Sequence, residues 1–175
     1  MRSATVAFVL FVSVAAIGGL PGDRQSAAAS QPAAAKLDRS HKGAAAPTAA
    51  FVDHAGKPVR IADFNGRPVL VNLWATWCAP CIAEMPALDR LAKRGGAKLA
   101  VLPVSQDLAG WHGVDKFFTP AKFPALTPYL DRENTLALKL GAAGLPVSVL
   151  YDAQGREVWR VAGPVEWDKM DAAAL

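Results

Sequence analysis

The residues of this chain best suited to chemistry are its two cysteines, Cys78 and Cys81, which are separated only by Ala79 and Pro80. Thiols with this spacing at the start of a helix come close enough to form a disulfide and to open it again. The amides of a helix N-terminus favour an anion, so Cys78 is predicted to have a lowered pKa and to act as the attacking thiolate. Cys81, turned inward, would then resolve the mixed disulfide. The pattern predicts a redox-active pair.

Three other interpretations of the pair remain open at this point. A structural disulfide is compatible with an exported protein, although so short a loop contributes little entropy. A zinc site would need two more ligands, and the three histidines, His41, His54 and His112, show no ligand spacing. Buried inert thiols are disfavoured by Pro80 and by the position at a helix start. No metal site is therefore expected.

The segments around the pair alternate between buried strands and helices. Residues 68–74 are almost continuously apolar, as expected for a strand buried on both faces, and residues 78–94 repeat apolar positions at three- and four-residue steps. The order of elements predicts a three-layer α/β domain with a mixed central sheet and an N-terminal β-hairpin. The other predicted elements are a hairpin over 51–61, a strand over 99–104, helices over 111–118, 134–140 and 167–175, and a hairpin over 147–161.

Residues 1–29 are predicted to be an export signal peptide. Arg2 gives a thin positive start, residues 4–20 are mostly apolar, and residues 27–29, all alanine, offer a cleavage site. An uncleaved N-terminal membrane anchor is the alternative, because the apolar run reaches the lower limit of a bilayer span. Residues 30–47, rich in Ala, Ser, Pro and Lys, are predicted to be a flexible linker, and residues 48–175 the folded domain.

Composition and charge exclude several other classes of protein. With 52% hydrophobic and 19% charged residues, the chain can build a core and does not have the composition of a solvated disordered protein. Two cysteines are too few for a small domain stapled by several disulfides. The net charge of +4 comes with no run of Lys or Arg interleaved with aromatic residues, so no nucleic-acid partner is expected.

The sequence around the cysteines resembles the exported TlpA/ResA-type thiol–disulfide oxidoreductases of the thioredoxin superfamily. The likeness is carried by residues 71–86 (VNLWATWCAPCIAEMP), 103–107 (PVSQD) and 144–152 (GLPVSVLYD), which occur in the order typical of the family. It extends over residues 48–167. The resemblance implies a thioredoxin-like fold, which agrees with the architecture predicted from the alternation of strands and helices.

The resemblance also implies a substrate-binding surface beside the cysteines. It implies that Pro146 follows a cis peptide bond and faces the pair. The backbone of Leu145 is expected to lie beside Cys78, where an extended substrate segment can pair with it. Trp77 and Pro80 are expected to complete this surface.

A carboxylate near the resolving thiol is a further implication. Glu84, three residues after Cys81, matches a family carboxylate that would pass protons to or from that thiol. The alternative is a solvated glutamate on the helix face. Where cytosolic thioredoxins have a buried aspartate on the preceding strand, this chain has Asn72. Asparagine does not titrate, so any proton handling is expected to fall to Glu84.

These features predict an enzyme, an exported protein thiol–disulfide oxidoreductase in which the reductase direction is favoured and no cofactor is needed. Substrates in the resembling family include the haem-attachment cysteines of apocytochrome c and copper-delivery proteins, with electrons from a membrane thiol donor of the CcdA/DsbD type. The expected location is the bacterial cell envelope, either soluble in the periplasm or anchored to the inner membrane. The alternatives are a thiol oxidase or isomerase using the same site, and a non-enzymatic Sco-like copper-handling protein.

Overall fold

The computed structural model describes residues 36–173 and residue 175. The predicted export signal or membrane anchor over 1–29 and the first part of the predicted linker lie outside these residues. Within the described part, no helix combines the length and the apolar character needed to cross a bilayer.

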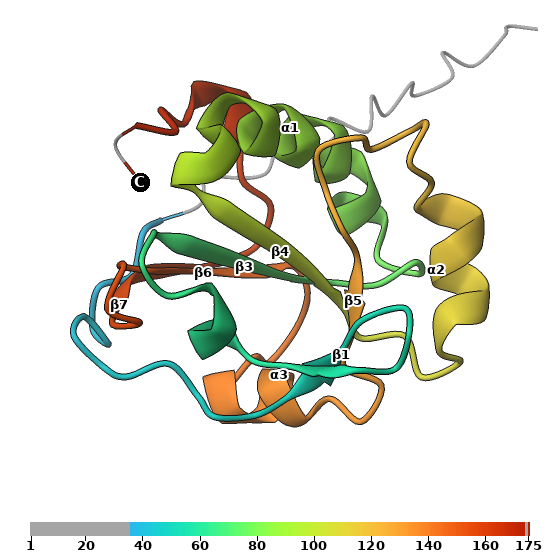
Figure 1. The fold of residues 1–175 in the computed structure, drawn as a ribbon, viewed down its shortest axis with the longest axis horizontal. Helices are drawn as coiled ribbons and strands as arrows, with labels where there is room; N and C mark the ends of the chain where they lie inside the picture. Colours follow the sequence, from blue (N-terminus) through green and yellow to red (C-terminus); the bar gives the residue numbers. More distant parts are fainter. Residues whose placement is uncertain (1–35, 174) are drawn as a thin grey trace, which may run out of the picture. The chain divides into compact units, whose positions relative to one another are not determined.

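A mixed sheet, seven-stranded in the described residues, forms the centre of the domain (Figure 1). Strands β3, β4 and β5 run parallel, whereas β6 pairs antiparallel with β3. The predicted N-terminal hairpin, β1–β2, and the predicted C-terminal hairpin, β6–β7, are both present. In sheet order the strands are β2 (Pro58–Val59), β1 (Phe51–Val52), β5 (Tyr129–Leu130), β4 (Ala100–Ser105), β3 (Val69–Trp74), β6 (Val147–Tyr151) and β7 (Glu157–Ala162).

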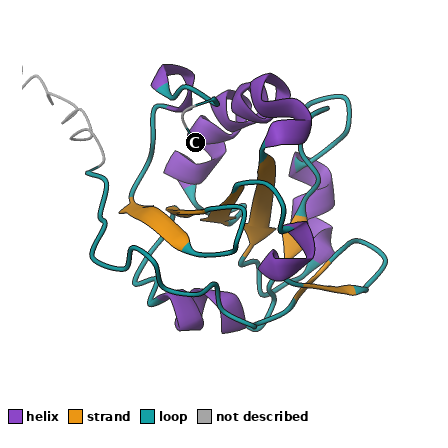
Figure 2. Ribbon diagram, turned by 60° about the vertical axis from the view of Figure 1, so that its left-hand side comes forward, coloured by secondary structure: helices purple, strands orange, loops and turns teal. Residues whose placement is uncertain are grey.

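Helices cover both faces of this sheet, as Figure 2 shows. The core on one face includes residues of α1 (Ala79–Gly95), α2 (Trp111–Phe117) and the 3-10 turn η3 (Trp167–Lys169). The core on the other face includes residues of α3 (Thr135–Leu140) and the 3-10 turn η1 (Ile61–Phe64). The predicted three-layer α/β architecture is confirmed.

Strand β3 is the central element that leads to the cysteines, and all six of its residues are buried. Successive side chains of a strand point to opposite faces, so Leu70 and Trp74 join the core under α1 while Val71 and Leu73 join the core under α3. This two-sided burial explains the continuous apolar run in the sequence. The same alternation places Asn72 on the α1 side.

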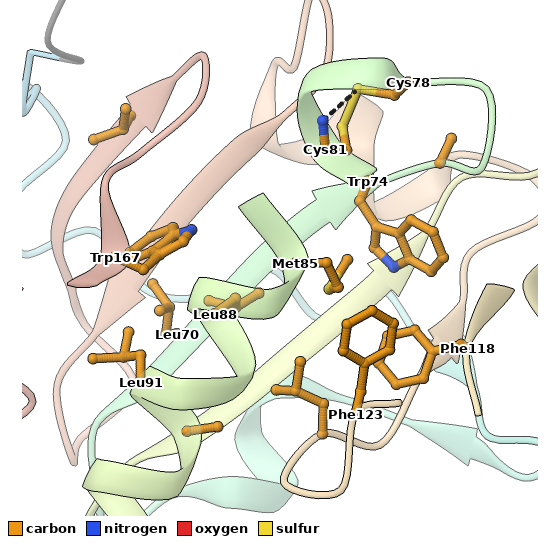
Figure 3. Close-up of a cluster of buried hydrophobic side chains, with 14 of the residues drawn as sticks. Leu70, Trp74, Cys78, Cys81, Met85, Leu88, Leu91, Phe118, Phe123 and Trp167 are labelled. Carbon is orange, nitrogen blue, oxygen red and sulfur yellow. Dashed lines mark hydrogen bonds between the residues drawn. A yellow bond between two sulfur atoms is a disulfide. The ribbon is translucent and has the colours of Figure 1, made fainter. Parts of the chain in front are cut away.

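Helix α1 begins and ends where its sequence permits. Cys78 is its N-cap, and Pro80 stands in the first turn, where a backbone N–H has no helical partner to lose. The helix ends at Gly95, and the capping residue after it, Gly96, has a φ of 50° that a residue with a side chain rarely adopts. Its apolar face packs against Leu70 and Trp74, forming the core beneath the disulfide (Figure 3). After α1, the 3-10 turn η2 (Gly96–Lys98) leads into β4.

Part of the predicted flexible linker is instead paired with the edge of the sheet. The N–H of Asp38 donates to the carbonyl of Arg160 in β7 at 2.8 Å, and the N–H of Glu157 donates to the carbonyl of Ala44 at 2.8 Å. β7 is the last strand of the sheet, so its outer backbone groups need partners. The prediction of a flexible linker is therefore wrong for residues 38–46, because backbone pairing leaves no mark in side-chain composition.

Two further elements differ from the sequence prediction. The helix expected over 167–175 is only the 3-10 turn Trp167–Lys169. After it, the Asp171 carboxylate accepts a hydrogen bond from the N–H of Ala173 at 2.9 Å, a local bond that competes with helix formation. Strand β5 was not predicted, because two residues following a proline-rich stretch are too few to show a periodicity.

Candidate active site

The two cysteines are joined by a disulfide at the N-terminus of α1, with their Cα atoms 5.3 Å apart. The Cys78 Sγ accepts a hydrogen bond from the N–H of Cys81 at 3.4 Å, drawn as a dashed line in Figure 3. Cys81 has no exposed surface, whereas 5% of Cys78 is exposed. A substrate sulfur can therefore approach Cys78 only, which is the asymmetry that the spacing predicted.

The position of Cys78 at the helix N-terminus favours its thiolate form. On reduction, the same N–H of Cys81 points at the Cys78 sulfur, and the positive end of the helix dipole adds to its effect. The first turn of α1, which the structure describes in full, contains no acidic side chain to oppose this.

The segment 144–146 provides the second part of the site. The Leu145–Pro146 peptide bond is cis, as the family resemblance implied. Pro146 is buried, and its carbonyl accepts a hydrogen bond from the N–H of Gly163 at 2.9 Å, which ties this segment to the end of β7. Leu145 is half-buried and lines a surface groove together with Trp77, the residue before Cys78. The structure thus brings these two predicted substrate-binding residues together.

The remaining predicted substrate-binding residue, Pro80, is exposed on the first turn of α1. Trp77 is also exposed, at 70% of its surface. The histidines that the described residues contain do not form a metal site with the cysteines: His54 contacts Asp115, and the described part of the chain holds no group of three or more His, Cys, Asp or Glu side chains arranged for a metal.

Glu84, one turn after Cys81 on α1, belongs to a buried polar cluster and is only 6% exposed. Its carboxylate accepts hydrogen bonds from the Asn72 amide at 2.9 Å and from the N–H of Val165 at 2.9 Å. The Asn72 amide also donates to the Ser148 hydroxyl at 3.0 Å. Burial raises the pKa of the Glu84 carboxyl, and the bonds from Val165 and Asn72 offset part of this rise. The alternative of a solvated glutamate is therefore wrong.

This cluster is not saturated with hydrogen bonds. The Asn72 Oδ1 is buried and has no partner among the described residues. Within the cluster of Asn72, Glu84 and Ser148, only Glu84 has an ionisable side chain. The arrangement can therefore store or release one proton one turn from Cys81.

A second buried carboxylate, Asp107, holds the loop that leads to Cys78. Asp107 follows β4 and is 5% exposed. It accepts hydrogen bonds from the Thr76 N–H at 3.0 Å, the Thr76 hydroxyl at 2.6 Å and the Ser105 hydroxyl at 2.6 Å. Thr76 also lies close to Gly113 of α2. A Cβ atom added to this glycine would lie 3.2 Å from the hydroxyl oxygen of Thr76. These contacts fix the backbone two residues before Cys78.

Sequence reasoning missed this contact. Asp107 stands in one of the segments that carry the family resemblance, but its partner Thr76 lies 31 residues away in the sequence. An acidic residue directly after a buried strand, with a hydroxyl residue two positions before it, was the available signal.

The comparisons with known proteins agree with this geometry. Residues 41–175 match the Redoxin family. The thiol-disulfide oxidoreductase ResA of Bacillus thuringiensis subsp. konkukian is 30% identical over 132 residues, which cover 73% of each chain. The thiol:disulfide interchange protein DsbE of Pseudomonas aeruginosa is 35% identical over 105 residues, covering 60% of this chain and 56% of that one.

A solved structure from Chlorobium tepidum, described as a thiol:disulfide interchange protein DsbE, is similar in both sequence and fold. It is 30% identical, has a TM-score of 0.64, and the match covers 77% of this chain and 92% of that one. The fold is accordingly thioredoxin-like. With Cys78 and Cys81 as its Cys-x-x-Cys pair, the chain belongs to the Redoxin family and is a thiol–disulfide oxidoreductase of the ResA/DsbE type.

Proposed function

We propose that the protein is an exported disulfide reductase of the bacterial cell envelope. The Cys78 thiolate attacks one sulfur of a substrate disulfide, and the other substrate sulfur leaves and takes up a proton. Cys81 then loses its proton and attacks the Cys78 Sγ, which closes the enzyme disulfide and releases the second substrate thiol. Two electrons pass from the enzyme dithiol to the substrate.

The observation that carries this proposal is the buried carboxylate of Glu84 one turn after Cys81. Cys81 has no exposed surface, so bulk water does not take its proton directly. Burial raises the pKa of Glu84, which makes its carboxylate a stronger base and lowers the cost of receiving the thiol proton. Hydrogen bonds from Asn72 and Val165 hold the carboxylate in place. Glu84 is thus suited to activate Cys81 for the resolving step.

The proposed substrates are exported proteins in which two cysteines have formed a disulfide but function only as free thiols. By resemblance to the TlpA/ResA type, these are apocytochrome c, with its haem-attachment cysteines, and copper-delivery proteins. The ResA and DsbE relatives support exchange with exported proteins as the general activity. Export itself is proposed from residues 1–29, as a cleaved signal or as an anchor that keeps the domain at the inner membrane.

A reductase needs a supply of electrons after each turnover, because the reaction leaves Cys78 and Cys81 as a disulfide. We assign this supply to a membrane dithiol donor of the CcdA/DsbD type. The donor attacks the same sulfur, that of Cys78, so substrate and donor use the site in turn.

The reduction potential of the Cys78–Cys81 pair tests the proposed direction. Titration of the protein with defined thiol–disulfide buffers, followed by the fluorescence of the adjacent Trp77, is expected to give a value at or below about −220 mV, the range of reductases that need an electron feed. A value between about −180 and −120 mV would contradict the proposal and assign the protein to the oxidases or isomerases.

A further inference from the structure

The large hydrophobic side chains that are exposed in the described residues gather at one place. They are Trp77, Leu108 and Leu138, exposed at 70%, 64% and 77%. All three line a single groove of about 380 Å³, which also includes Leu145. Isolated exposed leucines are common on protein surfaces, but a shared concave lining of this kind marks a binding surface.

The groove has an uncharged lining. Besides the four large residues, it is lined by Gln106, Asn134, and a set of alanines and a glycine from α3 and the loop after it. None of its lining residues is Asp, Glu, Lys or Arg. A charged side chain entering the groove would lose its hydrating water without gaining an ionic partner. An apolar side chain would instead bury apolar surface against the leucines and the tryptophan of the lining.

The groove is continuous with the active site. Among its lining residues, Trp77 directly precedes Cys78, and Leu145 directly precedes Pro146. Two other elements also line it, the loop after β4 with Leu108 and helix α3 with Leu138. Whatever pairs its cysteine with Cys78 therefore places its neighbouring residues at this groove.

We infer that the groove is a specificity subsite that takes an apolar side chain flanking the substrate cysteine, with Leu108 and Leu138 as its specificity-determining residues. The occupant is an extended segment of the substrate protein. This inference deepens the proposed function, since it names the chemistry of the substrate segment, but it holds for either direction of thiol exchange.

Activated peptides test the subsite independently of the reduction potential. Two peptides each contain a single cysteine that is bound to 2-thiopyridine as a mixed disulfide. One peptide has a leucine on both sides of this cysteine, and the other has a glutamine on both sides. Attack of the Cys78 thiolate on the peptide sulfur breaks this bond and releases thiopyridone, whose absorbance gives the rate. We expect the reduced wild-type protein to react about tenfold faster, as kcat/KM, with the leucine peptide.

The variants Leu108→Gln and Leu138→Gln identify the residues responsible. Each change is made at an exposed position, and each is expected to reduce the preference for the leucine peptide about threefold to tenfold. Lys139→Gln, an exposed position of α3 outside the groove lining, is the matched control and keeps the preference. The preference is read as the ratio of the two peptide rates within each variant, so that any change in the reactivity of the Cys78 thiolate cancels. The reduced wild-type protein is also assayed with dipyridyl disulfide, which has no peptide to bind.

Equal rates of the wild-type protein with both peptides would overturn the inference, as would an unchanged preference in both leucine variants. These results leave the reduction potential untouched, so failure of the subsite is distinguishable from failure of the proposed reductase direction. No reaction of the reduced protein with dipyridyl disulfide would instead remove the exchange chemistry on which both depend.

Discussion

Two buried carboxylates, Asp107 and Glu84, serve the segment that carries the cysteines, and they differ in what surrounds them. Asp107 accepts three hydrogen bonds, from the N–H and the hydroxyl of Thr76 and from the hydroxyl of Ser105. Glu84 accepts two, from the Asn72 amide and the N–H of Val165, and burial raises its pKa. We assign a structural role to Asp107, which three donors hold, and a role in proton transfer to Glu84, whose pKa burial raises. Burial alone does not distinguish the two roles.

Removing the charge of Asp107 is expected to have the larger effect on stability. In Asp107→Asn, the amide nitrogen faces the Thr76 hydroxyl, which can turn to accept from it, so the hydrogen bonds persist but lose the negative charge that strengthens them. Because these groups are buried, we expect the free energy of unfolding in urea to fall by about 2–4 kcal/mol. Asp115→Asn, at an exposed carboxylate of α2, is the control and changes stability by less than about 0.5 kcal/mol. Equal effects of the two changes on stability would contradict the structural role of Asp107.

The same change at Glu84 is expected to have the opposite sign. Folding raises the pKa of Glu84, so the unfolded chain loses this proton at a lower pH than the folded protein does. The contribution of Glu84 to stability is therefore complete below its ordinary pKa of about 4.3 and is lost as the pH rises towards the raised value. Glu84→Gln, which is never ionised, is expected to be more stable than the wild-type protein at pH 7.

This gain disappears at low pH. Near pH 3, more than one unit below the ordinary pKa of about 4.3, the wild-type carboxyl is protonated in both states, so the two proteins should unfold at the same urea concentration. A variant that is less stable than the wild-type protein at pH 7 would place Glu84 in the same class as Asp107.

The parts of the site that could be predicted from the sequence are those encoded locally. The spacing of Cys78 and Cys81, the apolar run of β3 and the apolar steps of α1 each lie within a short segment, and the structure has them as expected. For Glu84, the family resemblance implied a carboxylate near Cys81, while the alternative of a solvated glutamate stayed open until the structure showed its burial.

The parts that could not be predicted depend on contacts between distant segments. The bond from Thr76 to Asp107 joins two loops, and the groove brings together Leu108 and Leu138 from separate elements. The pairing of Asp38 with Arg160 uses backbone atoms only, so the side chains of an apparently flexible segment gave no sign of it. In each case the partner is chosen by the tertiary fold and not by the local sequence.

We propose that the buried carboxylate of Glu84 takes the proton of the buried Cys81 thiol. The pH dependence of the resolving step, measured in a single turnover as release of the second thiol from a peptide disulfide, tests this role. In the wild-type protein this rate should rise as the pH passes the raised pKa of Glu84, and in Glu84→Gln it should lose that rise and be at least about tenfold lower at pH 7. The preceding attack by Cys78 should have the same rate in both proteins. Identical pH profiles of the resolving step in the wild-type protein and in Glu84→Gln would contradict this role of Glu84.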